Sequence, residues 1–160
     1  MSANEFDGKR VFITGGSKGV GEAIVRRFAS GGAMVGTAAR SPLPEGNPSK
    51  LFVQADLSTR DGVDRIVREV LDNFGCLDVL IHNAGEGSRI RNIQWLGQED
   101  WDRVVAINLT ATYVLVQAVL PAMLARGRGT IVTVSSLAAL RPGLLSGPVY
   151  GAAKAGARSL

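Results

Sequence analysis

The chain has 160 residues, of which 46% are hydrophobic and 20% are charged, and its formal net charge is +4 at pH 7. This composition is typical of a globular protein, and the length is sufficient for one hydrophobic core. Cys76 is the single cysteine, which excludes an intrachain disulfide and a cysteine-based metal cluster, and we predict no metal site. The basic residues are scattered without a basic run, which argues against nucleic acid and agrees with a small anionic ligand.

Neither a membrane span nor a secretory signal is predicted. The longest strongly apolar stretch, residues 109–120, contains polar residues and is too short to cross a bilayer. Residues 1–10 lack the basic-then-apolar layout of a signal peptide. We therefore expect a cytoplasmic protein without a membrane partner.

Short apolar runs alternate along the chain with longer segments of helical period. In chain order, the pattern predicts a strand at 11–14, a helix at 20–30, strands at 33–38 and 51–53, a helix up to residue 74, a strand at 79–81, a helix at 99–125, a strand at 130–134 and a helix near residue 150. Strands that are apolar throughout and separated by helices form parallel sheets covered on both faces. The prediction is an α/β fold with a doubly wound parallel sheet, in one domain over residues 1–160.

The helix after the third strand has the clearest sequence pattern. Ser58 is its expected N-cap, and Asp61, three residues later, can return a hydrogen bond to the cap. Apolar residues then recur at helical spacing from Val63 to Phe74 and form one stripe. Gly75 is expected to end the helix.

A glycine-rich turn directly follows the first strand and opens the first helix. It reads Thr14-Gly15-Gly16-Ser17-Lys18-Gly19-Val20-Gly21, with the spacing G-x-x-x-G-x-G rather than the common dinucleotide fingerprint G-x-G-x-x-G. Glycines allow a tight turn and a close approach of the backbone to a pyrophosphate, which the helix N-terminus attracts. The turn is therefore a candidate dinucleotide site, and the alternative is a glycine turn with a purely structural role.

The end of the second strand bears on which dinucleotide is bound. An acidic residue there would bind the adenosine ribose 2′-hydroxyl and repel a 2′-phosphate. The chain has Ala38-Ala39-Arg40 instead, with no carboxylate before Glu45. Arg40 can grip a phosphate bidentately, and Lys18 can add a second positive charge. We expect NADP(H) in preference to NAD(H); the alternative is that both cations are ordinary solvated side chains.

Further motifs follow in a fixed order. They are Asn83-Ala84-Gly85 after the fourth strand, Asn108 in the long helix, Ser135-Ser136 at the end of the fifth strand, and Tyr150-Gly151-Ala152-Ala153-Lys154 in the last helix. Together with the glycine turn, they resemble the short-chain dehydrogenase/reductase family along essentially the whole chain. The resemblance implies a Rossmann-like fold and hydride transfer between NADP(H) and an alcohol or carbonyl substrate.

The resemblance also implies a role for each site residue. Tyr150 exchanges a proton with the substrate oxygen, and Lys154, four residues later on the same helix face, stabilises the phenolate and binds the nicotinamide ribose. Ser136, rather than Ser135, hydrogen-bonds the substrate oxygen. Asn108 holds a water molecule of the proton relay behind Lys154. The expected cofactor contacts are Asp56 and Leu57 at the adenine, and Asn83, Ala84 and Gly85 along the cofactor.

Some positions depart from the family pattern or stay open. His82 stands where the family usually has asparagine before Asn83, and we expect it to pack at the strand end rather than to catalyse. Arg89 and Arg91 could meet an acidic substrate, although solvation is the preferred interpretation. The stretch between the fifth strand and the last helix is predicted to be a loop of turns, because it contains Pro142, Gly143, Gly147 and Pro148.

Family members continue beyond the last helix with further strands and a segment that covers the substrate. By this resemblance we expect the chain to be C-terminally incomplete, with the fifth strand as an exposed edge. Two functions stay open: an oxidoreductase represented in part, or a truncated NADP(H)-binding or partner-binding protein without turnover. The long helix is apolar nearly all round between Val104 and Leu124, which favours a homodimer or homotetramer at full length.

Overall fold

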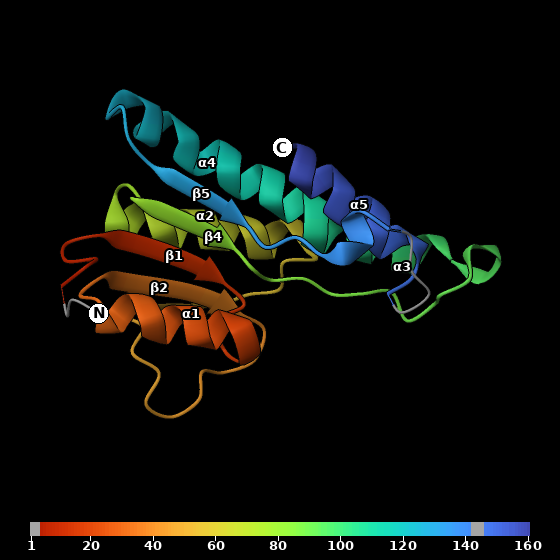
Figure 1. Ribbon diagram of the computed structural model, residues 1–160, viewed down its shortest axis with the longest axis horizontal. Helices are drawn as coiled ribbons and strands as arrows, with labels where there is room; N and C mark the ends of the chain where they lie inside the picture. Colours follow the sequence, from red (N-terminus) through yellow and green to blue (C-terminus); the bar gives the residue numbers. More distant parts are fainter. Residues whose placement is uncertain (1–3, 142–145) are drawn as a thin grey trace.

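The computed structural model describes residues 4–141 and 146–160 (Figure 1). Its strands are β1 (Arg10–Thr14), β2 (Met34–Ala39), β3 (Leu51–Gln54), β4 (Val79–His82) and β5 (Thr130–Thr133). Its helices are α1 (Gly19–Ser30), α2 (Arg60–Phe74), α3 (Gln98–Val105), α4 (Ala111–Ala125) and α5 (Pro148–Ser159). Two short 3-10 turns, η1 (Ile93–Trp95) and η3 (Leu137–Ala139), and a π-helical turn, η2 (Ala106–Thr110), complete the order. The predicted alternation is confirmed, and Pro142 and Gly143 of the predicted loop lie outside the described residues.

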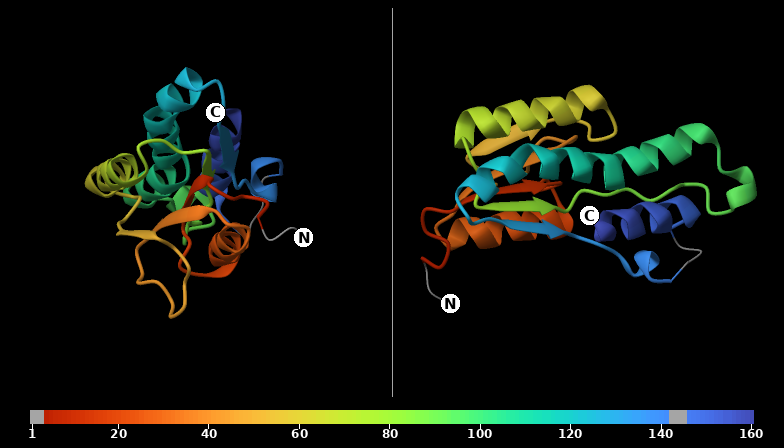
Figure 2. Two further views of the ribbon diagram at one scale, coloured as in Figure 1. Left: turned by 90° about the vertical axis from the view of Figure 1, so that its left-hand side faces the viewer. Right: turned by 90° about the horizontal axis from the view of Figure 1, so that it is seen from above.

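The five strands form one sheet in the order β3-β2-β1-β4-β5, and every neighbouring pair is parallel. From β1 the chain builds outward to β2 and β3 on one side and to β4 and β5 on the other. Helix α1 covers one face of the sheet, and α2 and α4 cover the opposite face (Figures 1 and 2). The predicted doubly wound, Rossmann-like fold is thus confirmed. Such sheets bind ligands where the winding direction reverses, which here is above the carboxyl end of β1.

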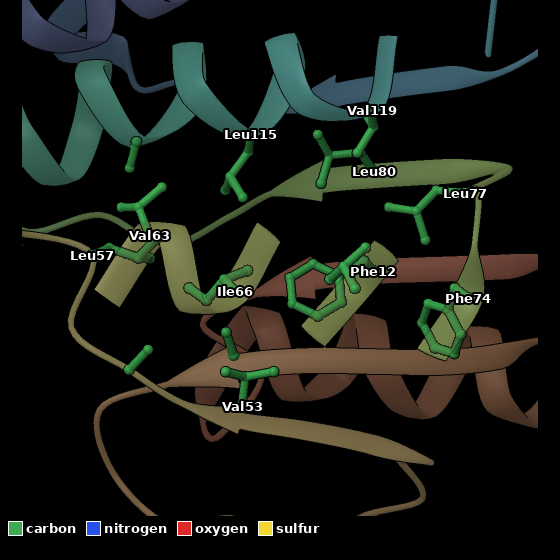
Figure 3. Close-up of a cluster of buried hydrophobic side chains, with 14 of the residues drawn as sticks. Phe12, Val53, Leu57, Val63, Ile66, Phe74, Leu77, Leu80, Leu115 and Val119 are labelled. Carbon is green, nitrogen blue, oxygen red and sulfur yellow. The ribbon is translucent and has the colours of Figure 1, made fainter. Parts of the chain in front are cut away.

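The central strand is buried on both faces, which explains its unbroken apolar sequence. Phe12 points into a cluster with Ile66 of α2 and Leu115 of α4 (Figure 3). Its neighbours Val11 and Ile13 point to the other face and pack in the cluster beneath α1. Truncating a fully buried phenylalanine such as Phe12 to alanine costs about 3–5 kcal/mol of stability.

The N-cap of helix α2 lies one residue later than predicted. Thr59 is the N-cap, and its Oγ1 accepts a hydrogen bond from the Gly62 backbone N–H at 3.1 Å. The prediction of Ser58 was wrong, because the Asp56 carboxylate accepts the Ser58 backbone N–H at 2.8 Å and closes a turn before the helix. Gly75 ends the helix with φ 65, as predicted, in a region that favours glycine.

The predicted long helix runs from Gln98 to Ala125 and contains one π-helical turn. Among the described residues, this stretch alone is long and apolar enough to cross a membrane, with a mean hydropathy of 1.7 in its most apolar window. Leu115 and Val119 are buried against the sheet and α2, so packing in the core accounts for much of the apolar sequence. Leu124 on the opposite side is 69% exposed, which confirms that apolar residues extend around the helix.

Candidate functional site

A cavity of about 430 Å³ opens at the carboxyl ends of the strands, above β1. It runs from residues that follow β2 and β3 to residues that follow β4. Its lining contains every predicted cofactor residue that precedes α5, namely Gly15, Ser17, Lys18, Gly19, Val20, Gly21, Arg40, Asp56, Leu57, Asn83, Ala84 and Gly85. Ala38, Ala39, Ser41, Ala55, Glu86 and Ile107 complete the lining. The structure therefore brings together residues that are far apart in the sequence.

The glycine turn between β1 and α1 needs glycine for reasons of conformation and space. Gly15 has φ 78, in the left-handed region, and its N–H donates to the Ala38 carbonyl at 2.6 Å. A Cβ on Gly21 would lie 2.1 Å from the Gly15 carbonyl oxygen, so the first turn of α1 can approach the loop only without a side chain. The N-cap residue Lys18 makes no side-chain cap hydrogen bond. The first N–H groups of α1 are thus not capped by it and can meet an anion.

A buried hydroxyl joins the end of β1 to the segment after β4. Thr14 Oγ1 accepts backbone N–H bonds from Asn83 at 3.1 Å and Ala84 at 3.0 Å. Its own proton is therefore left for Nδ1 of His82, 3.3 Å away. No role for Thr14 is predicted from the sequence motifs. The sequence feature that could have indicated its role is a hydroxyl residue at the end of a buried strand, immediately before the glycine turn.

His82 is completely buried and does not line the cavity. Burial, reinforced by the positive charge of Lys154, lowers the pKa of His82 to about 4. The imidazole is therefore neutral at pH 7, and its bond with Thr14 places the remaining ring proton on Nε2. This arrangement agrees with the expected packing role.

The four predicted catalytic residues lie outside the cavity lining, and two of them meet at Gly85. Asn108, in the π-helical turn, donates from Nδ2 to the carbonyls of Glu86 and Val104, both at 2.9 Å, and its Oδ1 has no protein partner among the described residues. Lys154 is 2% exposed and donates to the Val134 carbonyl at 2.8 Å, and burial lowers its pKa. A Cβ on Gly85 would lie 2.7 Å from Asn108 Oδ1 and 3.1 Å from Lys154 Nζ. Only glycine at position 85 therefore allows Asn108 and Lys154 to approach the cavity wall this closely.

Helix α5 carries Tyr150 and Lys154 on adjacent turns. Gly147, with φ 77, precedes the helix and Pro148 occupies its first position, an arrangement that proline favours. Lys154 Nζ lies 5.9 Å from the centroid of the Tyr150 ring. The 3-10 turn η3 packs against α5, and Ser136 caps this turn by accepting the Ala138 N–H at 3.2 Å. Ser136 thus lies on a segment in contact with α5, although no hydrogen bond links it to Tyr150 in the described part of the chain.

The cation predicted to select the cofactor already has a partner. Arg40 Nη2 lies 2.9 Å from Oε2 of Glu86, a residue that belongs to none of the predicted sequence motifs. Lys18 is exposed in the glycine turn, as are Arg89 and Arg91 in the loop after β4. Solvation stays the preferred interpretation for Arg89 and Arg91, although Arg91 also lines a cavity of about 820 Å³ next to η3 and α5.

A family model described as short chain dehydrogenase matches residues 9–160. The chain belongs to the short-chain dehydrogenase family. The resemblance read from the five motifs is thereby confirmed, and with it the assignment to a family of oxidoreductases.

Three similar proteins illustrate the range of this short-chain dehydrogenase's relatives. Sorbitol dehydrogenase from Cereibacter sphaeroides is 37% identical over 96% of this chain and 62% of its own length. The structure of L-sorbose reductase from Gluconobacter frateurii, complexed with NADPH and L-sorbose, has a TM-score of 0.87 at 33% identity, over 98% of this chain and 63% of the other. A metagenomic short-chain oxidoreductase in complex with NADP has a TM-score of 0.87 at 34% identity, over 97% of this chain and 73% of the other. The chain thus spans less than two thirds of the length of the first two proteins.

Proposed function

We propose that the protein transfers a hydride between NADP(H) and a small alcohol or carbonyl substrate, with Tyr150 as the acid/base. One observation carries the proposal: the buried ammonium of Lys154 reaches Gly85, in the wall of the cavity that also contains the glycine turn. Within the cavity, the glycine turn would bind the anion, and behind Gly85 in the cavity wall lies a cation beside Tyr150. This combination suits a dinucleotide whose reactive ring faces a proton donor.

The cofactor would lie along the cavity in a defined order. Asp56 and Leu57 would contact the adenine, Arg40 and Lys18 the 2′-phosphate, and the glycine turn the pyrophosphate. Asn83, Ala84 and Gly85 would form the wall towards the nicotinamide ribose, which Lys154 would bind. The close packing of the cavity wall supports this fit, because a side chain at Gly21 or Gly85 would collide with neighbouring protein atoms. The similar proteins with bound NADPH and NADP support it as well.

The protein's own part in the chemistry is proton transfer and orientation. The nicotinamide cofactor supplies or accepts the hydride when it is bound. Lys154 stabilises the phenolate of Tyr150 through its positive charge, and Ser136 hydrogen-bonds the substrate oxygen as charge develops there. Asn108 Oδ1, which has no partner in the described part of the chain, would hold a water molecule behind Lys154.

We further propose that residues 1–160 form a single NAD(P)-binding domain of a cytoplasmic enzyme that acts without nucleic acid or membrane. The full-length protein is a homodimer or homotetramer. The competing function is binding of NADP(H) or of a partner without turnover, and it predicts that the full-length protein consumes no NADPH with any substrate.

The test is Tyr150→Phe in the full-length protein, with NADPH consumption followed over a panel of small carbonyl compounds that includes ketoses. Removal of the hydroxyl is expected to lower kcat by at least about 100-fold, the usual contribution of a general acid/base. NADP(H) affinity should stay unchanged, because the ring and Lys154 remain. Tyr113→Phe, on the exposed surface of α4, is the matched control and should keep full activity.

Two outcomes contradict the proposal in different ways. If Tyr150→Phe keeps most of the activity of the unmodified protein, the assignment of the acid/base is wrong. If the unmodified protein binds NADP(H) but turns over none of the panel, binding without turnover is the better description.

A further inference from the structure

An ion pair joins the two sides of the cofactor cavity. Arg40 directly follows β2, Glu86 follows β4, and β1 lies between these strands. Both residues line the cavity, and their side chains approach to 2.9 Å. The pair therefore reaches over the carboxyl end of β1, the place where the cofactor is proposed to lie.

The two partners of this pair are held unequally. Glu86 also pairs with Arg103, which in turn contacts Asp100 at 2.5 Å. The hydrogen bond that Arg103 donates to Asp100 and the negative charge of Glu86 raise the pKa of Arg103. The Glu86 carbonyl is fixed as well, because it accepts from Asn108 Nδ2 at 2.9 Å. Glu86 is thus anchored to the protein on its far side.

Arg40 is anchored more weakly. Its side chain is 58% exposed, compared with 26% for the side chain of Glu86. The contact is an ion pair without the geometry of a hydrogen bond, since Glu86 Oε2 has no hydrogen-bond partner among the described residues. Arg40 is therefore the member of the pair that can exchange its partner, while Glu86 keeps Arg103.

We propose that Glu86 is a specificity-determining residue for the cofactor, because its carboxylate competes with the 2′-phosphate for Arg40. This inference rests on the proposed function, in which Arg40 receives that phosphate. A phosphate can take over the guanidinium with bidentate, charge-assisted hydrogen bonds, whereas a 2′-hydroxyl offers no charge to replace the carboxylate. Binding of NADP(H) therefore has to displace the Glu86 carboxylate from Arg40, whereas binding of NAD(H) does not. Glu86 thus reduces the preference for NADP(H) over NAD(H).

The test measures the affinities of NADP⁺ and NAD⁺ by isothermal titration calorimetry on the full-length protein. The proteins compared are the unmodified protein, Glu86→Gln, Arg40→Gln and the double variant. Glu86→Gln should tighten NADP⁺ binding by about fivefold, the upper range for an exposed ion pair, and change NAD⁺ affinity by less than about twofold. In the Arg40→Gln background, Glu86→Gln should have no effect on NADP⁺ affinity.

Asp64→Asn is the matched control, because it removes the same charge from an ion pair with Arg60 on α2, outside the cavity. It should leave both affinities unchanged. NAD⁺ binding reports that each variant keeps a folded site. The inference is overturned if Glu86→Gln weakens NADP⁺ binding or leaves it unchanged, or if it tightens both cofactors equally. If Arg40→Gln itself leaves NADP⁺ affinity unchanged, the proposed cofactor choice fails and the inference falls with it.

Discussion

A buried histidine at the end of β4 makes the stability of the protein depend on pH. His82 has a folded-state pKa of about 4, below its ordinary value of 6.5, because its charged form would be buried. As the pH falls from 6.5 to 4, the unfolded chain therefore binds the proton first, and stability present at neutral pH is lost. The loss expected over this window is about 3 kcal/mol. Urea unfolding at a series of pH values measures it.

His82→Asn, the residue usual for the family at this position, separates this effect from general acid destabilisation. The variant should lose much less stability between pH 6.5 and 4, while below pH 4 its curve should fall in parallel with that of the unmodified protein as carboxylates protonate. If the free energy of unfolding falls equally in the two proteins between pH 6.5 and 4, His82 is not the cause of the pH dependence.

At the scale of an element, the start of α1 reverses the ordinary preference for alanine within helices. Glycine to alanine in a helix normally stabilises by about 0.5–1 kcal/mol. A Cβ on Gly21 would lie 2.1 Å from the Gly15 carbonyl oxygen, so Gly21→Ala has to push the loop and helix apart. We expect it to destabilise the protein by about 1–3 kcal/mol, as overpacking does, and to weaken cofactor binding. Urea unfolding and a cofactor titration provide the two measurements.

Gly97→Ala is the control for this variant. Gly97 is the N-cap of α3 with φ −77, and an added Cβ would have no atom within 4 Å. Gly97→Ala should cost about 1 kcal/mol or less, because alanine is a poorer N-cap than glycine, and its cofactor affinity should stay close to that of the unmodified protein. A Gly21→Ala protein that behaves like this control would show that the loop adapts without loss.

At the scale of the whole molecule, the outer side of α4 predicts self-association. Tyr113, Leu120 and Leu124 are exposed at helical spacing and form an apolar stripe away from the core. We expect the full-length protein to be a homodimer or a homotetramer by light scattering, the usual closed symmetries. Leu120→Glu should shift it towards the monomer, because the charge would be buried in the contact. A monomer for the unmodified protein would contradict this expectation.

Leu71→Glu is the control for the interface variant. Leu71 lies on α2 and is 37% exposed, nearly the same as Leu120 at 38%, but it is not part of the stripe. This substitution introduces the same charge and should leave the oligomeric state unchanged. Dissociation by both variants would indicate general destabilisation rather than an interface on α4.

Local patterns were sufficient for the order of strands and helices, because burial periodicity and the conformational demands of glycine act over a few residues. They identified β1, the glycine turn and α1, and the motif order identified the family. The N-cap of α2 was missed by one residue because Ser58 and Thr59 are both common N-cap residues, and propensity alone does not rank them. Asp56 accepts the Ser58 N–H in the turn before the helix, and Thr59 accepts the Gly62 N–H. The roles of the site residues stay predictions.

Only the tertiary structure decided which distant side chains meet. The hydroxyl of Thr14 joins β1 to the segment after β4, and Asn108 and Lys154 converge on Gly85 from two different helices. The pair of Arg40 and Glu86 depends on the strand order β2-β1-β4, which places the ends of two strands on either side of β1. Strand order follows from how the whole sheet buries its two faces, and no local pattern in the sequence contains it.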